Sequence, residues 1–280
     1  MMRIGSENIS FYLNEGVCKM LNQWMRWIGL GAVGAAASLA GCGSGGSSDP
    51  TDNTVSTNTL TAEQVQGIWR GSLSADEVNT VILPDGQAWA VVTHTDGSRE
   101  LWQSDKLQPA GSTLQGDGKR YTFSLTSNSV AVSNFGLTVT AATPKTSVTA
   151  STNSGTQNWP LSLTIYDTRY DTPANFNEWI GNWQTQNGTA KVTWTVSGTE
   201  VGQRSLTGVG SGTGQDDCTY NGTLRTRNEN KAVLDVNLTQ TCSSVNIVFK
   251  GIGIMSSSTR ASLTLVTQDA QSAALLALTR

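Results

Sequence analysis

The sequence has few charged residues and almost no histidine. Charged residues make up 14% of the 280 positions, against about a quarter in typical soluble proteins. The single histidine, His94, excludes a metal site built from several histidines. The formal charge is −3, and it becomes −4 when residues 1–41, with three basic and two acidic side chains, are removed. Because no basic stripe remains to neutralise phosphates, we expect no nucleic-acid partner.

The sequence also lacks an apolar run long enough to span a membrane. The stretch from Trp27 to Leu39 is shorter than the about 20 residues that a spanning helix needs. Preceded by the positive charge of Arg26, it fits the apolar region of a secretory signal peptide. A polar run with two glutamates stands ahead of this segment, so we expect the true start to be Met20 or Met25.

The end of the apolar stretch, Leu39-Ala40-Gly41-Cys42, resembles the lipobox of bacterial lipoproteins. The resemblance implies cleavage between Gly41 and Cys42 and attachment of diacylglycerol to the Cys42 thiol, which finally carries three acyl chains. Two chains already anchor a protein stably. Gly43 stands where aspartate favours inner-membrane retention in enteric bacteria, so the resemblance implies the outer membrane, facing the periplasm or the cell surface. The alternative is an ordinary signal peptide followed by a cysteine.

The composition divides the chain into four parts. Residues 1–41 are the expected signal peptide. Residues 42–59 are rich in Gly, Ser, Thr, Asp and Asn, which cannot form a core, and we expect a lipidated flexible tether there. Residues 60–172 and 173–280 are expected to form two β lobes.

Two short segments spaced like one small domain have the same pattern. Thr61-Ala62-Glu63-Gln64 has the form of a helix-capping box and leads into Gly67-Ile68-Trp69. Asp171-Thr172-Pro173 can start a second short helix, which leads into Gly181-Asn182-Trp183. This internal repeat indicates two similar lobes.

The rest of the body is predicted to be β-strand. Period-two alternation of apolar with polar residues puts one face on a core and the other in solvent, and it occurs at 121–126, 161–165, 192–196 and 232–239. Hairpin turns are indicated by pairs that supply positive φ angles, namely Asp85-Gly86, Asp96-Gly97, Asn187-Gly188 and Ser197-Gly198. Only the alanine-rich run at 269–278 is ambiguous between helix and strand. The pattern predicts an all-β body of antiparallel barrels or sandwiches.

A short helical turn followed by Gly-x-Trp resembles the opening of the calycin barrels, the lipocalin and avidin group, in which the tryptophan closes one barrel end. The residues that carry it are Gly67 and Trp69, and again Gly181 and Trp183. The resemblance implies two calycin-like antiparallel β-barrel lobes. The segment Cys218–Thr223, with its later cysteine, also resembles uncharacterised proteobacterial lipoproteins, which implies no activity.

Two cysteines remain free after export. Cys42 then carries lipid and Cys18 has been removed, which leaves Cys218 and Cys242 in an oxidising compartment. A hairpin that turns near Asn230, midway between them, brings them side by side. We expect a disulfide, and the alternative is two reduced, buried cysteines.

The residues that could support catalysis are few. A Ser/His/Asp triad would have to use His94, which precedes the Asp96-Gly97 turn and is expected to face solvent. The pairs Asp76-Glu77 and Asp216-Asp217 lack the spacing of a calcium loop, and solvated loop charge is the favoured interpretation. The glycines at 208–214 precede no P-loop lysine and indicate a hairpin loop. We predict no catalytic residue, no metal site and no cofactor.

The mature chain has seven tryptophans. Trp69 and Trp183 are expected to be core plugs. Four further tryptophans either pack in the core or line a cavity or a sugar-stacking face. They are Trp89, Trp102, Trp159 and Trp194.

These observations favour a non-catalytic binding or interaction lipoprotein, which presents a barrel mouth or loop surface to a small apolar ligand or to an envelope protein. A structural or assembly factor of the outer membrane is the alternative, and a filled barrel interior would favour it. An envelope hydrolase is a third hypothesis, which needs two carboxylates in a cleft or His94 beside a nucleophile.

Overall fold

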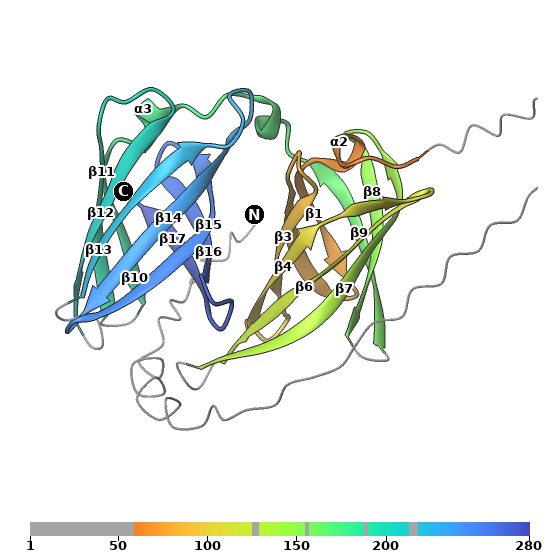
Figure 1. Ribbon diagram of the computed structural model, residues 1–280, viewed down its shortest axis with the longest axis horizontal. Coiled ribbons are helices and arrows are strands. Elements are labelled where there is room, and N and C mark those ends of the chain that lie inside the picture. The colour runs from red at the N-terminus through yellow and green to blue at the C-terminus, as the bar shows by residue number, and fades with distance from the viewer. Residues whose placement is uncertain (1–58, 125–128, 155–156, 188–189, 213–217) are drawn as a thin grey trace, which may run out of the picture.

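The computed structural model of the chain describes residues 59–124, 129–154, 157–187, 190–212 and 218–280. The expected signal peptide, Gly41, Cys42 and nearly all of the expected tether lie outside these residues, as do Asp216 and Asp217. The described chain forms two antiparallel β-barrels side by side (Figure 1). The predicted fold class, two similar antiparallel barrel lobes, is therefore confirmed.

Barrel 1 is a meander that closes on itself. Neighbours in the chain pair in order, β1 pairs with β9, and β4 pairs directly with β6, while the short β5 only extends the edge of β6. Its strands are β1 (Gly67–Leu73), β2 (Asp76–Ile82), β3 (Gln87–Thr93), β4 (Arg99–Lys106), β5 (Gln108–Ala110), β6 (Thr113–Phe123), β7 (Val130–Thr143), β8 (Ser147–Ser154) and β9 (Gln157–Tyr166).

Barrel 2 has the same up-and-down order, and its last strand returns to its first. Its strands are β10 (Gly181–Asn187), β11 (Ala190–Ser197), β12 (Gln203–Ser211), β13 (Cys218–Thr226), β14 (Val233–Cys242), β15 (Val245–Ser257), β16 (Arg260–Thr267) and β17 (Ala273–Thr279). Asp85-Gly86 and Asp96-Gly97 lie between consecutive strands as predicted, Gly198 follows the end of β11 at Ser197, and each of these glycines has a positive φ. Gly188 is outside the described residues.

A short α-helix precedes each barrel, and both helices lie at the same end of the molecule (Figure 1). They are α2 (Ala62–Val65) and α3 (Phe176–Trp179), and the 3-10 helix η1 (Thr168–Asp171) lies in the link between the barrels. At α2 the side chain of Gln64 accepts a hydrogen bond from the Thr61 amide at 2.8 Å, as the capping box predicts. The expected start of the second helix is corrected: Asn175 caps α3, and Asp171 instead ends η1.

The two Gly-x-Trp segments have the same geometry. The indole Nε1 of Trp69 donates to the carbonyl of Val65 at 2.9 Å, and that of Trp183 donates to the carbonyl of Trp179 at 2.7 Å. Each acceptor is the last residue of its helix. Both Trp69 and Trp183 are fully buried, so each closes its barrel at the helix end. Gly181, with φ 126°, makes the turn into its strand in a conformation that other residues rarely adopt.

The Ala-rich run at 269–278 is a strand over most of its length, β17. Its sequence shows no alternation because both of its faces are buried. Ala274, Leu276 and Leu278 point into barrel 2, while Ala273 and Leu275 belong to the apolar contact between the barrels. The expected glycine loop is also corrected in part, because Gly208 and Gly210 lie within β12.

Gly208 has a packing role. It pairs directly with Trp194 across β11 and β12. A Cβ atom at this position would lie 2.7 Å from the Trp194 ring, closer than real contacts allow. The glycine therefore leaves the space that the indole fills inside barrel 2.

Candidate functional site

Buried side chains pack together inside both barrels. Trp69, Trp102, Phe135 and other buried residues pack together in barrel 1, and the space left among the described side chains is about 20 Å³. Trp183, Trp194 and Tyr220 belong to the corresponding core of barrel 2. A drug-sized ligand needs a cavity of about 300 Å³ or more. The core of barrel 1 therefore has no room for such a ligand.

A charged cluster closes the end of barrel 1 that lies opposite α2. Nδ1 of His94 is 2.8 Å from Oδ2 of Asp76, and Nε2 is 3.3 Å from Oε1 of Glu100. Glu100 is buried and also accepts hydrogen bonds from Arg120 Nε and Trp102 Nε1, each at 2.7 Å. The expectation that His94 faces solvent is wrong, because its side chain is only 25% exposed and lies between two carboxylates.

This cluster stabilises the charged forms of His94 and Glu100. Partial burial lowers the pKa of His94, but the hydrogen bond to Asp76 and the charges of Glu100 and Asp76 outweigh it, so the pKa is raised. Burial raises the pKa of Glu100, but hydrogen bonds from Arg120 and Trp102 and the charge of Arg120 bring it below its usual value. A histidine that donates from both nitrogens is the charged imidazolium.

This arrangement limits the chemistry that His94 can perform. A general base in a hydroxyl nucleophile mechanism needs one free imidazole nitrogen beside the hydroxyl. Both nitrogens of His94 face carboxylate oxygens, so neither is placed to accept a proton from a serine. Asp76, expected to be solvated loop charge, instead begins β2 and binds the imidazole.

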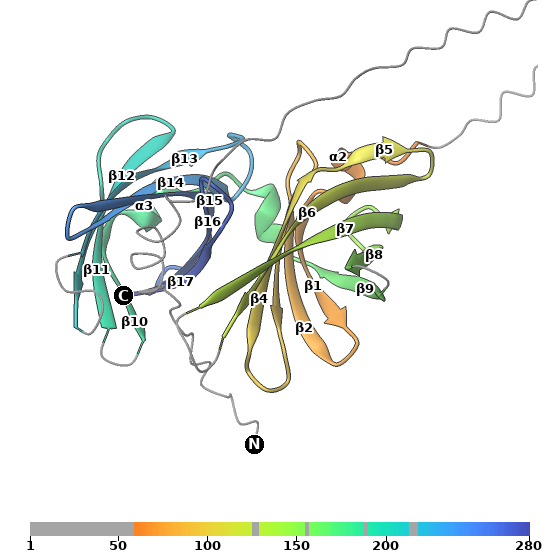
Figure 2. The ribbon, with the colours of Figure 1, turned by 60° about the horizontal axis from the view of Figure 1, so that its bottom comes forward.

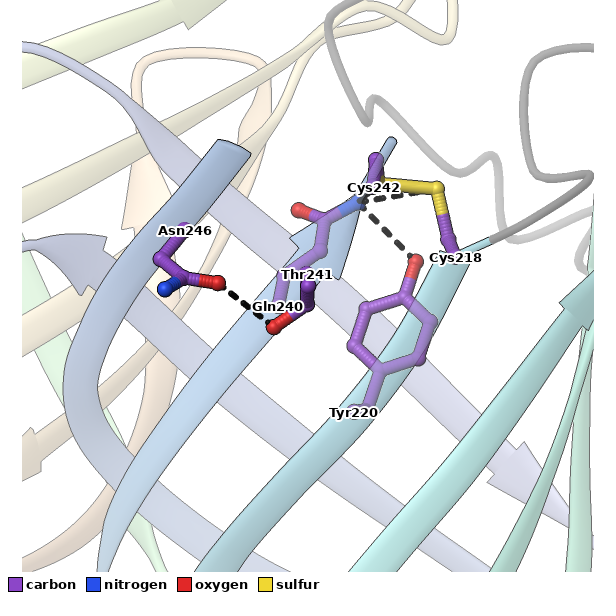
Figure 3. The surroundings of a disulfide bond; sticks show 6 residues. All are labelled: Cys218, Tyr220, Gln240, Thr241, Cys242 and Asn246. Atoms are coloured by element: carbon purple, nitrogen blue, oxygen red, sulfur yellow. Dashed lines mark hydrogen bonds between the residues drawn. A yellow bond between two sulfur atoms is a disulfide. The ribbon is translucent and has the colours of Figure 1, made fainter. Parts of the chain in front are cut away.

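In barrel 2, the end that lies opposite α3 contains neutral polar groups and the predicted disulfide (Figure 3). Cys218 and Cys242 stand directly opposite each other on β13 and β14, with Cα atoms 4.2 Å apart, and the disulfide is confirmed. Beside it, Nε2 of Gln240 donates to the Tyr220 hydroxyl at 3.1 Å. Burial raises the pKa of Tyr220, so its phenol stays neutral.

The remaining tryptophans have different roles. Trp194 is buried inside barrel 2, where its Nε1 donates to the Thr185 hydroxyl at 2.8 Å. Trp102 is inside barrel 1 and stacks near the partly buried Trp159, with ring centroids 6.0 Å apart. Trp89 lies outside the barrel, in the apolar contact between the two barrels.

A cleft of about 490 Å³ lies between the barrels, which stand side by side in Figure 2. Its walls are the outer faces of β1, β2 and β3 on one side and of β15, β16 and β17 on the other. Pockets of this size bind small molecules, and they occur preferentially between domains. This cleft is therefore the candidate binding site.

The register of the strands arranges the cleft side chains in rows. The base of the cleft is made of buried apolar residues from both barrels, and the wall above it mixes half-buried apolar and polar residues. On barrel 1 the successive rows are Ile68-Val81-Trp89, Arg70-Asn79-Val91 and Glu77-Thr93-Arg99. On barrel 2 they are Ile252-Thr264-Leu275 and Ile254-Ser262-Ala277.

Two arginines share one carboxylate beside the cleft. The guanidinium of Arg169 binds the carboxylate of Asp167, and one of its nitrogens also donates to the Ser256 carbonyl in barrel 2. Arg70 approaches the same carboxylate at 4.0 Å. The hydrogen bonds from Arg169 hold the pKa of Asp167 below its ordinary value. This group of three therefore carries one net positive charge.

Two kinds of site are absent from the part of the chain that the structure describes. It has no group of three or more His, Cys, Asp or Glu side chains arranged to hold a metal ion. It also contains no helix with the length and hydrophobicity that crossing a bilayer requires.

Comparisons of the chain with protein-family models, with curated proteins and with solved structures found no match.

Proposed function

We propose that this chain is a bacterial envelope lipoprotein, anchored in the outer membrane through lipid on Cys42, whose barrels form a non-catalytic binding or interaction module. The observation that carries the second part is that buried side chains pack together inside each barrel, while an apolar cleft lies between the barrels. The expected barrel mouth is therefore replaced, as the binding surface, by the outer faces of the strands. The Cys218–Cys242 disulfide supports an oxidising compartment.

The environment of His94 supports a non-catalytic role. A hydrolase built on the one histidine would need it beside a nucleophile. Its neighbours are Asp76 and Glu100, and Arg120 holds Glu100 in turn. Such a network stabilises a barrel end and leaves neither imidazole nitrogen free to accept a proton from a nucleophile.

A structural or assembly factor of the outer membrane is the second candidate. The filled core of barrel 1 favours it, because a protein that acts through a partner needs an external surface and no internal cavity. Cross-linking in intact cells separates the two candidates. A large envelope protein captured through the strand faces would support assembly, whereas a small molecule that copurifies would support ligand binding.

The anchor is tested by replacing its thiol. In cells given labelled palmitate, the wild-type chain should be labelled and should sediment with the outer membrane, because two or more acyl chains anchor it stably. Cys42→Ala should take no label, and the chain should stay uncut or leave the membrane. Cys218→Ala is the matched control, since it removes a different thiol, and it should keep the label. Palmitate label on the Cys42→Ala chain would refute the anchor.

A further inference from the structure

We propose that the cleft between the barrels binds a single-chain amphiphile with an anionic head group. The acyl chain lies on the apolar base of the cleft, and the carboxylate or phosphate lies at Arg70 and Arg169. This inference rests on the proposed binding function and names its ligand class.

The base of the cleft suits an acyl chain. Val81 and Trp89 of barrel 1 face Ile252 and Leu275 of barrel 2, and all four are at least nine-tenths buried. The side chains of Val81, Ile252 and Leu275 have no hydrogen-bonding group. The indole N–H of Trp89 is already used, because it donates to the side chain of Gln87 at 3.1 Å. An apolar chain loses no hydrogen bond on entering such a space and removes apolar surface from water.

The cleft edge suits an anion. The side chain of Arg70 is 51% exposed and that of Arg169 is 43% exposed. Among the described residues the guanidinium of Arg70 makes no hydrogen bond, since its nearest carboxylate oxygen is 4.0 Å away. A guanidinium has five donors in a fork that matches a carboxylate or a phosphate. Arg70 therefore has its donors available for a second anion.

The walls of the cleft do not suit an added peptide strand. Strand addition needs a sheet edge with unpaired backbone groups. β2 pairs with β1 and β3, and β16 pairs with β15 and β17. The cleft therefore presents side chains and no free backbone edge, which favours a small amphiphile over an extended peptide.

The experiment uses the mature lipoprotein in phosphatidylcholine nanodiscs, with three photoreactive probes of the same alkyl chain. The probes carry a carboxylate, a phosphate or an uncharged alcohol, and the labelled peptides are mapped by mass spectrometry. We expect the anionic probes to label β2, β3 and β15 to β17, and the alcohol about tenfold less, the difference that one charge-assisted hydrogen bond makes. A stronger label from one anionic head identifies the source as a fatty acid or as a phospholipid.

Variants separate the head-group site from the chain site. Arg70→Gln should lower labelling by the anionic probes about tenfold and leave the alcohol unchanged. Arg260→Gln, at an exposed arginine outside the cleft, is the matched control and should change nothing. Ala277→Trp should block all three probes, and Ser262→Trp on the next strand should do the same if the first variant folds poorly.

Three outcomes would overturn this inference: label outside the cleft, equal labelling by all three heads, or labelling that is unchanged by the tryptophan variants. These are distinguishable from a failure of the proposed function. A chain that keeps lipid on Cys42 and copurifies with a different small molecule, but takes no probe, contradicts only the cleft ligand. A chain without lipid on Cys42 that still takes the probe contradicts only the anchor.

Discussion

His94 shows how neighbouring charges can hold one side chain at a barrel end. Its imidazole is between carboxylates from β2 and β4, while Arg120 of β6 neutralises one of them. The corresponding end of barrel 2 uses neutral groups, with Gln240 donating to Tyr220 next to the disulfide. Two barrels of the same topology therefore stabilise their ends by different interactions.

The histidine gives a pH dependence of known sign. Because its folded pKa is raised, its contribution to stability is complete below the unfolded value of about 6.5 and is lost as pH rises through the folded pKa. We expect His94→Asn to lower the free energy of unfolding by about 1 kcal/mol at pH 5.5 and by less at pH 8.5. Chemical denaturation at both values measures this.

The Asp76→Asn variant is the matched partner, since it removes the hydrogen bond that raises the pKa most. It should reduce the difference in the free energy of unfolding between pH 5.5 and pH 8.5. His94 is the only histidine in the sequence, so no other imidazole can cause this pH dependence. A loss of stability of the same size at pH 5.5 and pH 8.5 would contradict the charged interaction.

The hairpin of β13 and β14 is an element whose pairing could be read from the sequence. The two cysteines are equidistant from the turn, and the register indeed places them opposite each other. Loss of this bridge, of sequence separation 24, should cost about 3 kcal/mol through the entropy of the unfolded chain. Denaturation of the Cys218→Ala/Cys242→Ala protein, followed by tryptophan fluorescence, measures the loss.

Reduction supplies the control for this prediction. Wild-type protein treated with a thiol reductant should unfold at the denaturant concentration of the double variant. The double variant itself should not respond to the reductant. If oxidised and reduced wild type unfolded together, the bridge would contribute nothing to stability.

The sequence predicted strands where apolar and polar residues alternate, and it stayed ambiguous at β17, where both faces are buried. Alternation identified 192–196 and 232–239 because their outward side chains are mostly exposed or partly exposed. β17 lies against barrel 1, so Ala and Leu occupy both of its faces and the pattern resembles a helix. The partners of His94 could not be predicted from the sequence either, because their contact depends on how several strands meet at one end of barrel 1.

At the scale of the whole molecule, the link holds the barrels together. Oδ1 of Asp171 is 2.9 Å from Nζ of Lys231 in barrel 2, and Oδ2 is 2.8 Å from Nζ of Lys145 in barrel 1. Burial raises the pKa of Asp171, but hydrogen bonds from both lysines and from Tyr166 lower it to about 2. Arg227 of barrel 2 adds a contact with Asp85 of barrel 1 at 3.4 Å.

Asp171→Asn should loosen this link. The carboxylate stabilises the fold above the unfolded pKa of about 3.9, and this contribution is lost as pH falls through about 2. At pH 7 we expect a loss of up to about 1 kcal/mol and faster hydrogen exchange in η1 and at the start of β14. Asp117→Asn, at an exposed residue of β6, should leave exchange there unchanged. Equal exchange in both variants would refute the role of Asp171.

The contact between the barrels could not be predicted, because it joins outward residues from distant strands. Val81, Trp89 and Leu101 alternate with the barrel 1 core, and in sequence they look like ordinary strand residues. The packing of the two barrels against each other shows that the outer faces of these strands also bury apolar surface. The cleft beside that contact was hidden for the same reason.

The closure of barrel 2 has a consequence for how molecules behave when they are crowded. The described residues of β10 and β17 share one registered pair, Gln184 with Thr279, whereas β1 and β9 share four. Thermal fluctuations should therefore open barrel 2 at this seam first. An opened seam exposes two strand edges, and β17 is apolar on both faces, so neighbouring chains at high concentration would exchange their last strands and form swapped dimers.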